Sequence, residues 1–149
     1  MTENPGSATK SPDLSDLEAF AKERIAAERY PDDLHTCRVA TCESCGVTSF
    51  ELTVEQDEGS KPGRFKGVIW AQCSGCASRQ RFLSFTAYPE RGKTIKVEHP
   101  TCQCGATTFF VLECERIEVW DGTPSFFDEG VVAGKCAHCG AFHAFALTD

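Results

Sequence analysis

Apolar residues recur at helical spacing near the start of the chain. Segment 11–30 is predicted to form an N-terminal helix, running from about residue 12 to 29. Ser11-Pro12-Asp13 offers a capping hydroxyl, a proline for the first helical position and an acidic residue in the first turn, and Tyr30-Pro31 ends the pattern. The apolar stripe consists of Leu14, Leu17, Phe20, Ala21 and Ile25. We expect this stripe to cover a sheet of the same chain, the alternative being a docking helix for a partner.

Residues 1–10 are small and polar and are predicted to form a disordered tail. From residue 36 onward the pattern changes to strands. Phe50, Leu52 and Val54 alternate with polar residues, a turn-rich segment covers 56–63, and residues 65–71 return as a second strand. Residues 109–120 and 130–133 predict a second hairpin. Its strands are apolar on both faces, so we expect cover on both sides.

The two predicted hairpins belong to an internal repeat. Residues 41–50 parallel residues 101–109, and Gly67-Val68-Ile69 before one cysteine pair parallels Gly130-Val131-Val132 before another. The repeat predicts two units, 36–88 and 95–149, each with a knuckle, two strands, a second knuckle and a third strand. In this alignment Cys37 is equivalent to Val97, which favours Cys37 as a small core residue.

Eight cysteines fall in four close pairs. Three pairs are spaced C-x-x-C and one C-x-C, and three are followed by glycine, which supplies the positive φ of a tight turn. This spacing is typical of zinc knuckles. The pairs are Cys42 with Cys45, Cys73 with Cys76, Cys102 with Cys104, and Cys136 with Cys139.

Ten cysteines in 149 residues indicate either disulfides or metal. The polar N-terminus does not resemble a signal peptide, and no stretch reaches the roughly 18 apolar residues of a membrane span. We therefore expect a cytoplasmic, reduced protein in which paired cysteines bind metal. Two units of about 50 residues are small enough to need a metal for folding.

The knuckle spacing resembles the zinc-ribbon class, with its rubredoxin-type zinc knuckles, over residues 36–149. No individual family is recognised. The resemblance implies a mainly β protein with an N-terminal α-helix and two tandem zinc ribbons, each a small three-stranded antiparallel sheet with two knuckles. It also implies two Zn²⁺ ions, one per ribbon. The implied ligands are Cys42, Cys45, Cys73 and Cys76 for the first ion and Cys102, Cys104, Cys136 and Cys139 for the second. Four thiolates leave no open position, so both sites are expected to be structural and the protein not an enzyme.

The Cys102-Gln103-Cys104 knuckle is one residue shorter than its counterpart, and His99 is the candidate to replace a thiolate there. A catalytic zinc would need an opening at this knuckle. Cys114 is expected to be a small buried residue. His138 and His143 are expected to be surface side chains. A rubredoxin-like iron electron carrier is a further alternative, although the knuckles lack the proline of that family's C-P-x-C-G pattern.

The formal charge is -7, and two zinc ions on eight thiolates bring the loaded protein to about -11. Residues 61–96 are nevertheless basic. Nucleic-acid binding through this part of the first ribbon is therefore the alternative function. Its candidate residues are Trp70, Arg79, Arg81 and Phe82.

The acidic hairpin tip at 120–130 carries three large aromatic residues, Trp120, Phe126 and Phe127. Aromatic residues on a loop suit a protein-binding site, unless they fold back onto the sheet. The sequence thus predicts a non-catalytic zinc-binding interaction or regulatory module with a protein partner. No membrane contact and no small-molecule substrate are expected.

Overall fold

The computed structural model describes residues 13–25, 34–59, 65, 67–82, 94–120 and 122–148, and for some strand residues among these it describes the backbone alone. This part of the chain is mainly β, with one short helix and eight strands. The elements are α2 Ser15–Arg24, β1 Leu34–Val39, β2 Ser49–Asp57, β3 Gly67–Cys73, β4 Arg79–Phe82, β5 Ile95–Glu98, β6 Thr108–Trp120, β7 Thr123–Cys136 and β8 Phe142–Thr148. Within the described ranges no helix is long and apolar enough to cross a membrane.

All eight strands belong to one antiparallel sheet. The main order is β4-β3-β2-β6-β7-β8, with β1 paired to β6 and β5 paired to β2. We refer to β2, β3, β4 and β5 as the first half of the sheet and to β6, β7, β8 and β1 as the second half. The structure thus differs from the expectation of two separate three-stranded sheets, because β2 and β6 pair and join the two halves.

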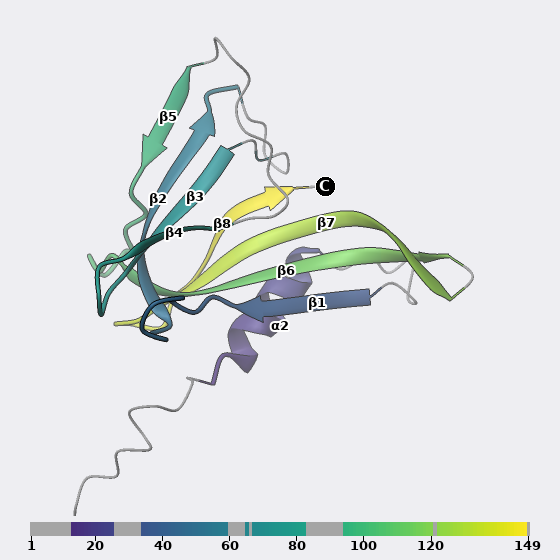
Figure 1. Ribbon diagram of the computed structural model, residues 1–149, viewed down its shortest axis with the longest axis horizontal. Coiled ribbons are helices and arrows are strands. Elements are labelled where there is room, and N and C mark those ends of the chain that lie inside the picture. The colour runs from purple at the N-terminus through teal and green to yellow at the C-terminus, as the bar shows by residue number, and fades with distance from the viewer. Residues whose placement is uncertain are drawn as a thin grey trace, which may run out of the picture.

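The junction between the halves is short. Ser49–Glu51 of β2 pairs with Thr108–Phe110 of β6, with Phe50 directly opposite Phe109. Beyond these residues the strands separate, so the β2–β3 and β6–β7 hairpins leave a common base in different directions (Figure 1). The space beside each separated strand is taken by a short strand, β5 next to β2 and β1 next to β6.

Two clusters of buried residues stabilise this bent sheet. The main core lies at the base and includes Phe50 and Phe109, both fully buried, with Leu52, Ile69 and Val111. The helix core lies between α2 and the opposite face of β6 and β7. Its buried members are Leu14, Leu17, Ala21, Ile25, Leu112, Cys114, Val131 and Ala133. The prediction that the later hairpin is covered on both faces is therefore confirmed.

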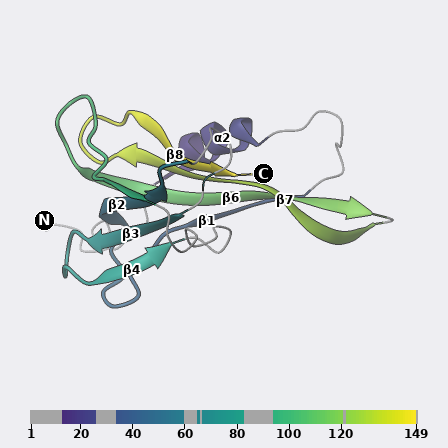
Figure 2. The same cartoon turned by 90° about the horizontal axis from the view of Figure 1, so that it is seen from above.

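The helix is shorter than predicted within the described residues, and residues 1–12 and 26–33 lie outside them. It packs on β6, β7 and β8 (Figure 2). Polar contacts fix both of its ends: Lys135 Nζ lies 2.9 Å from an Asp16 carboxylate oxygen, and the buried Arg116 donates from Nε to the carbonyl of Ile25 at 2.9 Å. The apolar stripe thus covers the protein's own sheet.

The predicted tip at 120–130 is mostly strand. β6 continues to Trp120 and β7 begins at Thr123, and the pairing tolerates register shifts after Arg116 and after Glu118. A bulge lets an antiparallel ladder absorb irregular residues such as Pro124, so turn-forming composition here did not mean a loop. The side chains of Trp120, Phe126 and Phe127 lie outside the described residues.

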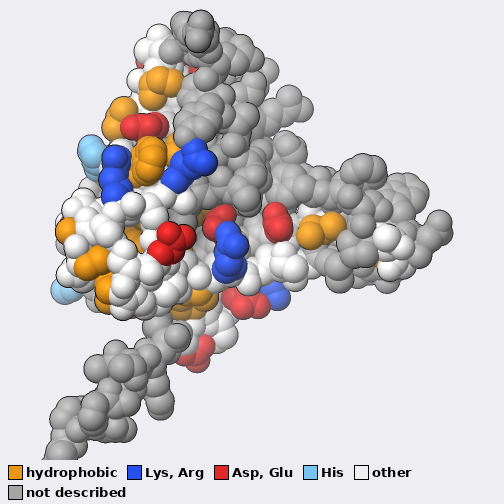
Figure 3. All heavy atoms as spheres, viewed as in Figure 1, with side chains coloured by type: hydrophobic (Ala, Val, Ile, Leu, Met, Phe, Trp, Pro, Cys, Tyr) orange, Lys and Arg blue, Asp and Glu red, His pale blue; other side chains and the backbone are white. Residues whose placement is uncertain are grey.

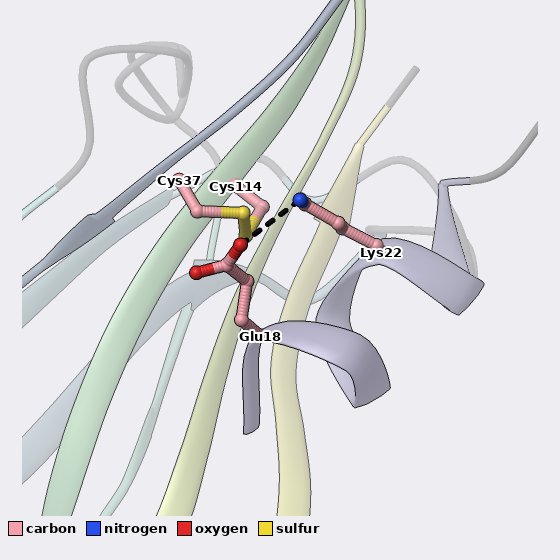
Figure 4. The surroundings of a disulfide bond; sticks show 4 residues. All are labelled: Glu18, Lys22, Cys37 and Cys114. Atoms are coloured by element: carbon pink, nitrogen blue, oxygen red, sulfur yellow. Dashed lines mark ion pairs between the residues drawn. A yellow bond between two sulfur atoms is a disulfide. The ribbon is translucent and has the colours of Figure 1, made fainter. Parts of the chain in front are cut away.

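Cys37 and Cys114 are joined by a disulfide (Figure 4). The two residues are direct cross-strand partners in the β1–β6 pair. The expectation of two small core residues is only half right: Cys114 is buried in the helix core and Cys37 packs against it, but as a bonded pair. The internal repeat aligns Cys37 with Val97, but it does not indicate which strand pairs with the strand that contains Cys37.

We expect this bond to be detectable by alkylation. Protein denatured in the presence of a metal chelator and without reductant should take up alkyl groups on the eight free cysteines only, because a disulfide has no thiol to react. Peptide mass spectrometry should find Cys37 and Cys114 linked to each other. Pretreatment with a reductant is the control and should expose all ten cysteines. Ten alkyl groups without reductant would contradict the pairing.

Candidate metal centres

Each of the four knuckles is a tight turn closed by backbone hydrogen bonds. In the first, the N–H of Cys42 donates to Val47 O at 2.8 Å and the N–H of Gly46 donates to Cys42 O at 2.9 Å. The Cys73 and Cys136 knuckles repeat this pattern. The N–H groups of Ala77 and Gly140, one residue after the second cysteine, donate to Cys73 O and Cys136 O. The turns lie before β2, between β3 and β4, before β6, and between β7 and β8. Strand pairing then brings the knuckles together two by two.

The sulfur atoms converge in two groups of four. Cys42 Sγ lies 3.7 Å from Cys76 Sγ, and Cys45 Sγ lies 3.4 Å from Cys73 Sγ. The second group has Cys102 Sγ 3.5 Å from Cys139 Sγ and Cys104 Sγ 3.6 Å from Cys136 Sγ. Within each group all sulfurs lie within 4.8 Å of one another. Four sulfurs bound to one zinc at about 2.3 Å in a tetrahedron would lie about 3.8 Å apart, so both groups could hold such an ion.

We name these groups cluster 1 (Cys42, Cys45, Cys73, Cys76) and cluster 2 (Cys102, Cys104, Cys136, Cys139). In both, the first cysteine of each knuckle is buried and the second is exposed. The four buried cysteines all belong to the main core. Each cluster therefore has two cysteines in the main core and two at the surface, at the base of the sheet.

Backbone amides point at the sulfurs. Cys73 Sγ accepts hydrogen bonds from the N–H groups of Gly75 and Cys76 at 3.3 and 3.4 Å, and Cys136 Sγ accepts from His138 and Cys139, both at 3.4 Å. Such donors stabilise a thiolate over a thiol. The amides of Cys139 and His138 lower the pKa of Cys136 to about 6, against the opposing effect of burial.

Cluster 1 has a hydroxyl group bound to two of its sulfurs. Ser78 Oγ lies 3.3 Å from Cys42 Sγ and 3.1 Å from Cys76 Sγ. The hydrogen bond between Ser78 and Cys42 is the main reason that the pKa of Cys42 is lowered to about 6. Cys45 behaves oppositely: the amide of Val47 favours its thiolate, but the adjacent Cys73 thiol and burial raise its pKa to about 12. Four like charges so close cannot all form without a cation, which a divalent metal would supply.

The short knuckle of cluster 2 closes one residue earlier than the others. Gly105 N–H donates to Cys102 O at 2.8 Å, three residues back instead of four. The tighter turn still delivers Cys104 Sγ to the group. His99 lies outside it, with Nδ1 3.3 Å from the Thr53 hydroxyl. A histidine substitute at this knuckle is therefore not required by the geometry.

His143 was expected to be a surface side chain, and this is only partly right. The side chain is half-buried, stacks on Phe145 with ring centroids 5.9 Å apart, and places Nε2 3.4 Å from Cys102 Sγ. No local pattern marks this contact, since the equivalent residue after the second knuckle of the first repeat is Gln80, which bonds to Thr41 O instead. His138 is exposed, as expected.

Three candidate nucleic-acid residues lie together on the first half of the sheet. Trp70 is directly opposite Arg81 in the β3–β4 pair, and the Arg79 guanidinium lies 4.6 Å from the Trp70 ring centroid. Trp70 also donates from Nε1 to Glu55 at 3.2 Å. The side chain of the fourth candidate, Phe82, lies outside the described residues. The described patch is therefore of mixed charge.

No protein-family model matches this chain, and the searches of curated proteins and of solved structures found no match. The metal centres therefore rest on their own geometry. The donor set is what soft divalent ions prefer, and two groups of four thiols support a metal-binding module with two ions.

In one knuckle the residue after the second cysteine is not glycine. Gly46, Gly105 and Gly140 follow the second cysteine of their knuckles with φ between 81° and 93°, whereas Ala77 takes this place in the second knuckle with φ 64°. A residue with a Cβ costs about 1–2 kcal/mol in the left-handed region. The second knuckle of cluster 1 is therefore the strained one.

We expect Ala77→Gly to stabilise the metal-loaded protein. The gain should be roughly 0.5–1 kcal/mol, because relief of the strain exceeds the extra backbone entropy that glycine loses on folding. Thermal unfolding at a fixed zinc concentration measures it as a higher Tm. The matched control is Gly46→Ala, where an added Cβ would meet nothing within 4 Å and only the positive φ acts against it. This control should lower Tm. A lower Tm for Ala77→Gly would contradict the assignment of strain.

Proposed function

We propose that the protein is a non-catalytic module in which two zinc ions brace a bent sheet that presents a binding face to a protein partner. The observation that carries this proposal is the closure of each cluster by four thiols, with no fifth donor required. A zinc ion with four thiolates has no position left for water or substrate. Zinc is preferred to iron because the knuckles lack the proline of rubredoxins.

We further propose that the chain consists of two duplicated ribbons whose sheets have merged. Equivalent residues of the repeat have equivalent partners in the sheet, and this supports the proposal. Phe50 is opposite Cys73 just as Phe109 is opposite Cys136. The same holds at the far ends of the hairpins and in the third strands. The pairs are Gln56 with Gly67 and Glu115 with Gly130, and Gln72 with Arg79 and Lys135 with Phe142.

The equivalent faces of the two halves carry different residues. In the second half, α2 covers Leu112, Cys114, Val131 and Ala133. The corresponding residues of the first half are Thr53, Glu55, Val68 and Trp70. Val68 is buried, whereas Thr53, Glu55 and Trp70 are partly exposed. We call the surface formed by these three partly exposed residues with Ile95, Val97, Arg79 and Arg81 the open face.

Ile95 and Val97 on the open face are 42% and 53% exposed, the highest values for large apolar side chains among the described residues. The register places Val97 opposite Glu55, on the same side of the sheet as Trp70. Figure 3 shows hydrophobic, cationic and acidic side chains close together on this part of the molecule. Exposed apolar residues rimmed by charge suit a protein interface. The aromatic residues Trp120, Phe126 and Phe127 stay a second candidate contact.

Nucleic-acid binding is the second candidate function. It is favoured by the Arg79 guanidinium over the aromatic ring of Trp70 and by Arg81 directly opposite Trp70 in the sheet. The nearby Glu55 and the net charge of -7 oppose it, since phosphate contacts depend on positive potential. The open face therefore fits a protein better than a nucleic acid.

Metal analysis tests the first part of the proposal. Native mass spectrometry with elemental analysis should find two zinc ions per chain. Cys45→Ser and Cys104→Ser should each reduce this number to one, because each removes a ligand from a different cluster. Ser44→Ala is the control beside a ligand and should keep both ions. Iron with a reversible redox couple would support the electron carrier instead, and a chain without metal would refute the module.

Capture from cell extract tests the open face. We expect Val97→Lys to abolish a protein interaction that the parent chain makes, because the charge would be buried in the interface. Val39→Lys is the matched control, since Val39 is 37% exposed on β1 of the second half. This variant should keep the interaction. If nuclease treatment or moderate salt removes the captured material instead, nucleic-acid binding is the function.

A further inference from the structure

The strands that lead into the two clusters are exchanged between the halves of the sheet. β1 runs directly into the first knuckle of cluster 1, yet it pairs with β6, from Leu34 opposite Ile117 to Val39 opposite Leu112. β5 runs into the short knuckle of cluster 2, yet it pairs with β2, from Val54 opposite Glu98 to Asp57 opposite Ile95. Each cluster is thus entered by a strand that the other half holds in place.

A single row of residues also crosses the sheet from one cluster to the other. Cys73 is opposite Phe50, Phe50 is opposite Phe109, and Phe109 is opposite Cys136. Directly opposed residues lie on the same face of a sheet and contact one another. Three strand spacings of about 4.8 Å separate the terminal cysteines by roughly 14 Å. One ligand of each cluster is therefore connected through two fully buried phenylalanines.

Backbone bonds on either side of this row tie the knuckles to the central strands. Ser74 N–H donates to Ser49 O at 3.1 Å in the first half, and Ala137 N–H donates to Thr108 O at 2.9 Å in the second. The donors follow Cys73 and Cys136 directly, and the acceptors lie in or beside the β2–β6 junction. Each of these knuckles is therefore bonded to one strand of the junction, and the two junction strands pair with each other.

We propose that the two clusters bind metal cooperatively: an ion in either cluster raises the affinity of the other through the Phe50–Phe109 junction and the exchanged strands. This inference rests on the proposed metal binding and adds that the two sites form one folding unit. The ion that binds first orders the junction and both entering strands. The second ion then binds to a cluster that is already largely ordered, so less conformational entropy is lost on binding. The coupling is reciprocal, as linkage requires.

The coupling can be measured as a ratio of dissociation constants on the full chain. Competition with a chromophoric zinc chelator gives the constant for the second zinc of the parent protein. It also gives the single constants of Cys45→Ser and Cys104→Ser. Both substitutions remove an exposed ligand and leave the buried cysteines of the main core in place.

Cooperative clusters predict that the remaining site of each variant binds zinc roughly 5- to 150-fold more weakly than the same site does in the parent chain with its neighbour filled. The factor should agree between the two variants. Equal constants in variant and parent would overturn the coupling while leaving the metal sites intact. Failure of all three chains to bind zinc would instead overturn the proposed function.

Two phenylalanine variants test the route. Phe109→Leu shortens a side chain in the connecting row. In a chain with this substitution, the ratio of dissociation constants obtained with Cys45→Ser, which is the coupling factor, should fall toward one. Phe110→Leu is the matched control: the backbone of Phe110 also belongs to the β2–β6 junction, but its side chain lies on the other face and packs against the helix core. This variant should keep the factor. Loss of coupling in both, or in neither, would place the connection elsewhere. If Phe109→Leu does not fold, the comparison of the cysteine variants still decides whether the clusters are coupled.

Discussion

The contact between Phe50 and Phe109 is the constraint on which the rest of the structure depends. Only three residues of β2 and three of β6 pair with each other, but this pairing turns two hairpins into one sheet. Both phenylalanines are completely buried, and the main core around them contains cysteines from both clusters. A hairpin with its own knuckles would be too small to form such a core alone. The shared base therefore contributes the buried apolar core, and the metal sites contribute the tight turns.

The sequence predicts the local features of this fold well. Cysteine spacing identifies the eight thiols that converge, and strand alternation at Phe50, Leu52 and Val54 marks the residues that enter the core. The helical stripe likewise identifies the residues that cover β6 and β7. Each of these features depends on neighbours in the sequence, for which periodicity and spacing are direct physical signals.

The pairing between distant strands could not be predicted. Nothing in Leu34–Val39 indicates that β1 pairs with β6 in the other repeat, and the Cys37–Cys114 bond follows only from that pairing. The contact of His143 with Cys102 has the same origin, since it needs the register of β8 beside the short knuckle. Composition misled at 120–130, because bulges let a strand accommodate residues that usually form turns.

The disulfide also closes a covalent ring within the chain. Residues 37–114 lie inside the ring, and so do all of cluster 1 and the Cys102 and Cys104 thiols of cluster 2. Only Cys136 and Cys139 remain on the open C-terminal arm. A closed ring has fewer conformations than a linear chain of equal length, so its thiols search a smaller volume for one another. In the oxidised, unfolded chain, cluster 1 can therefore assemble within the ring, whereas cluster 2 must recruit half its donors from outside.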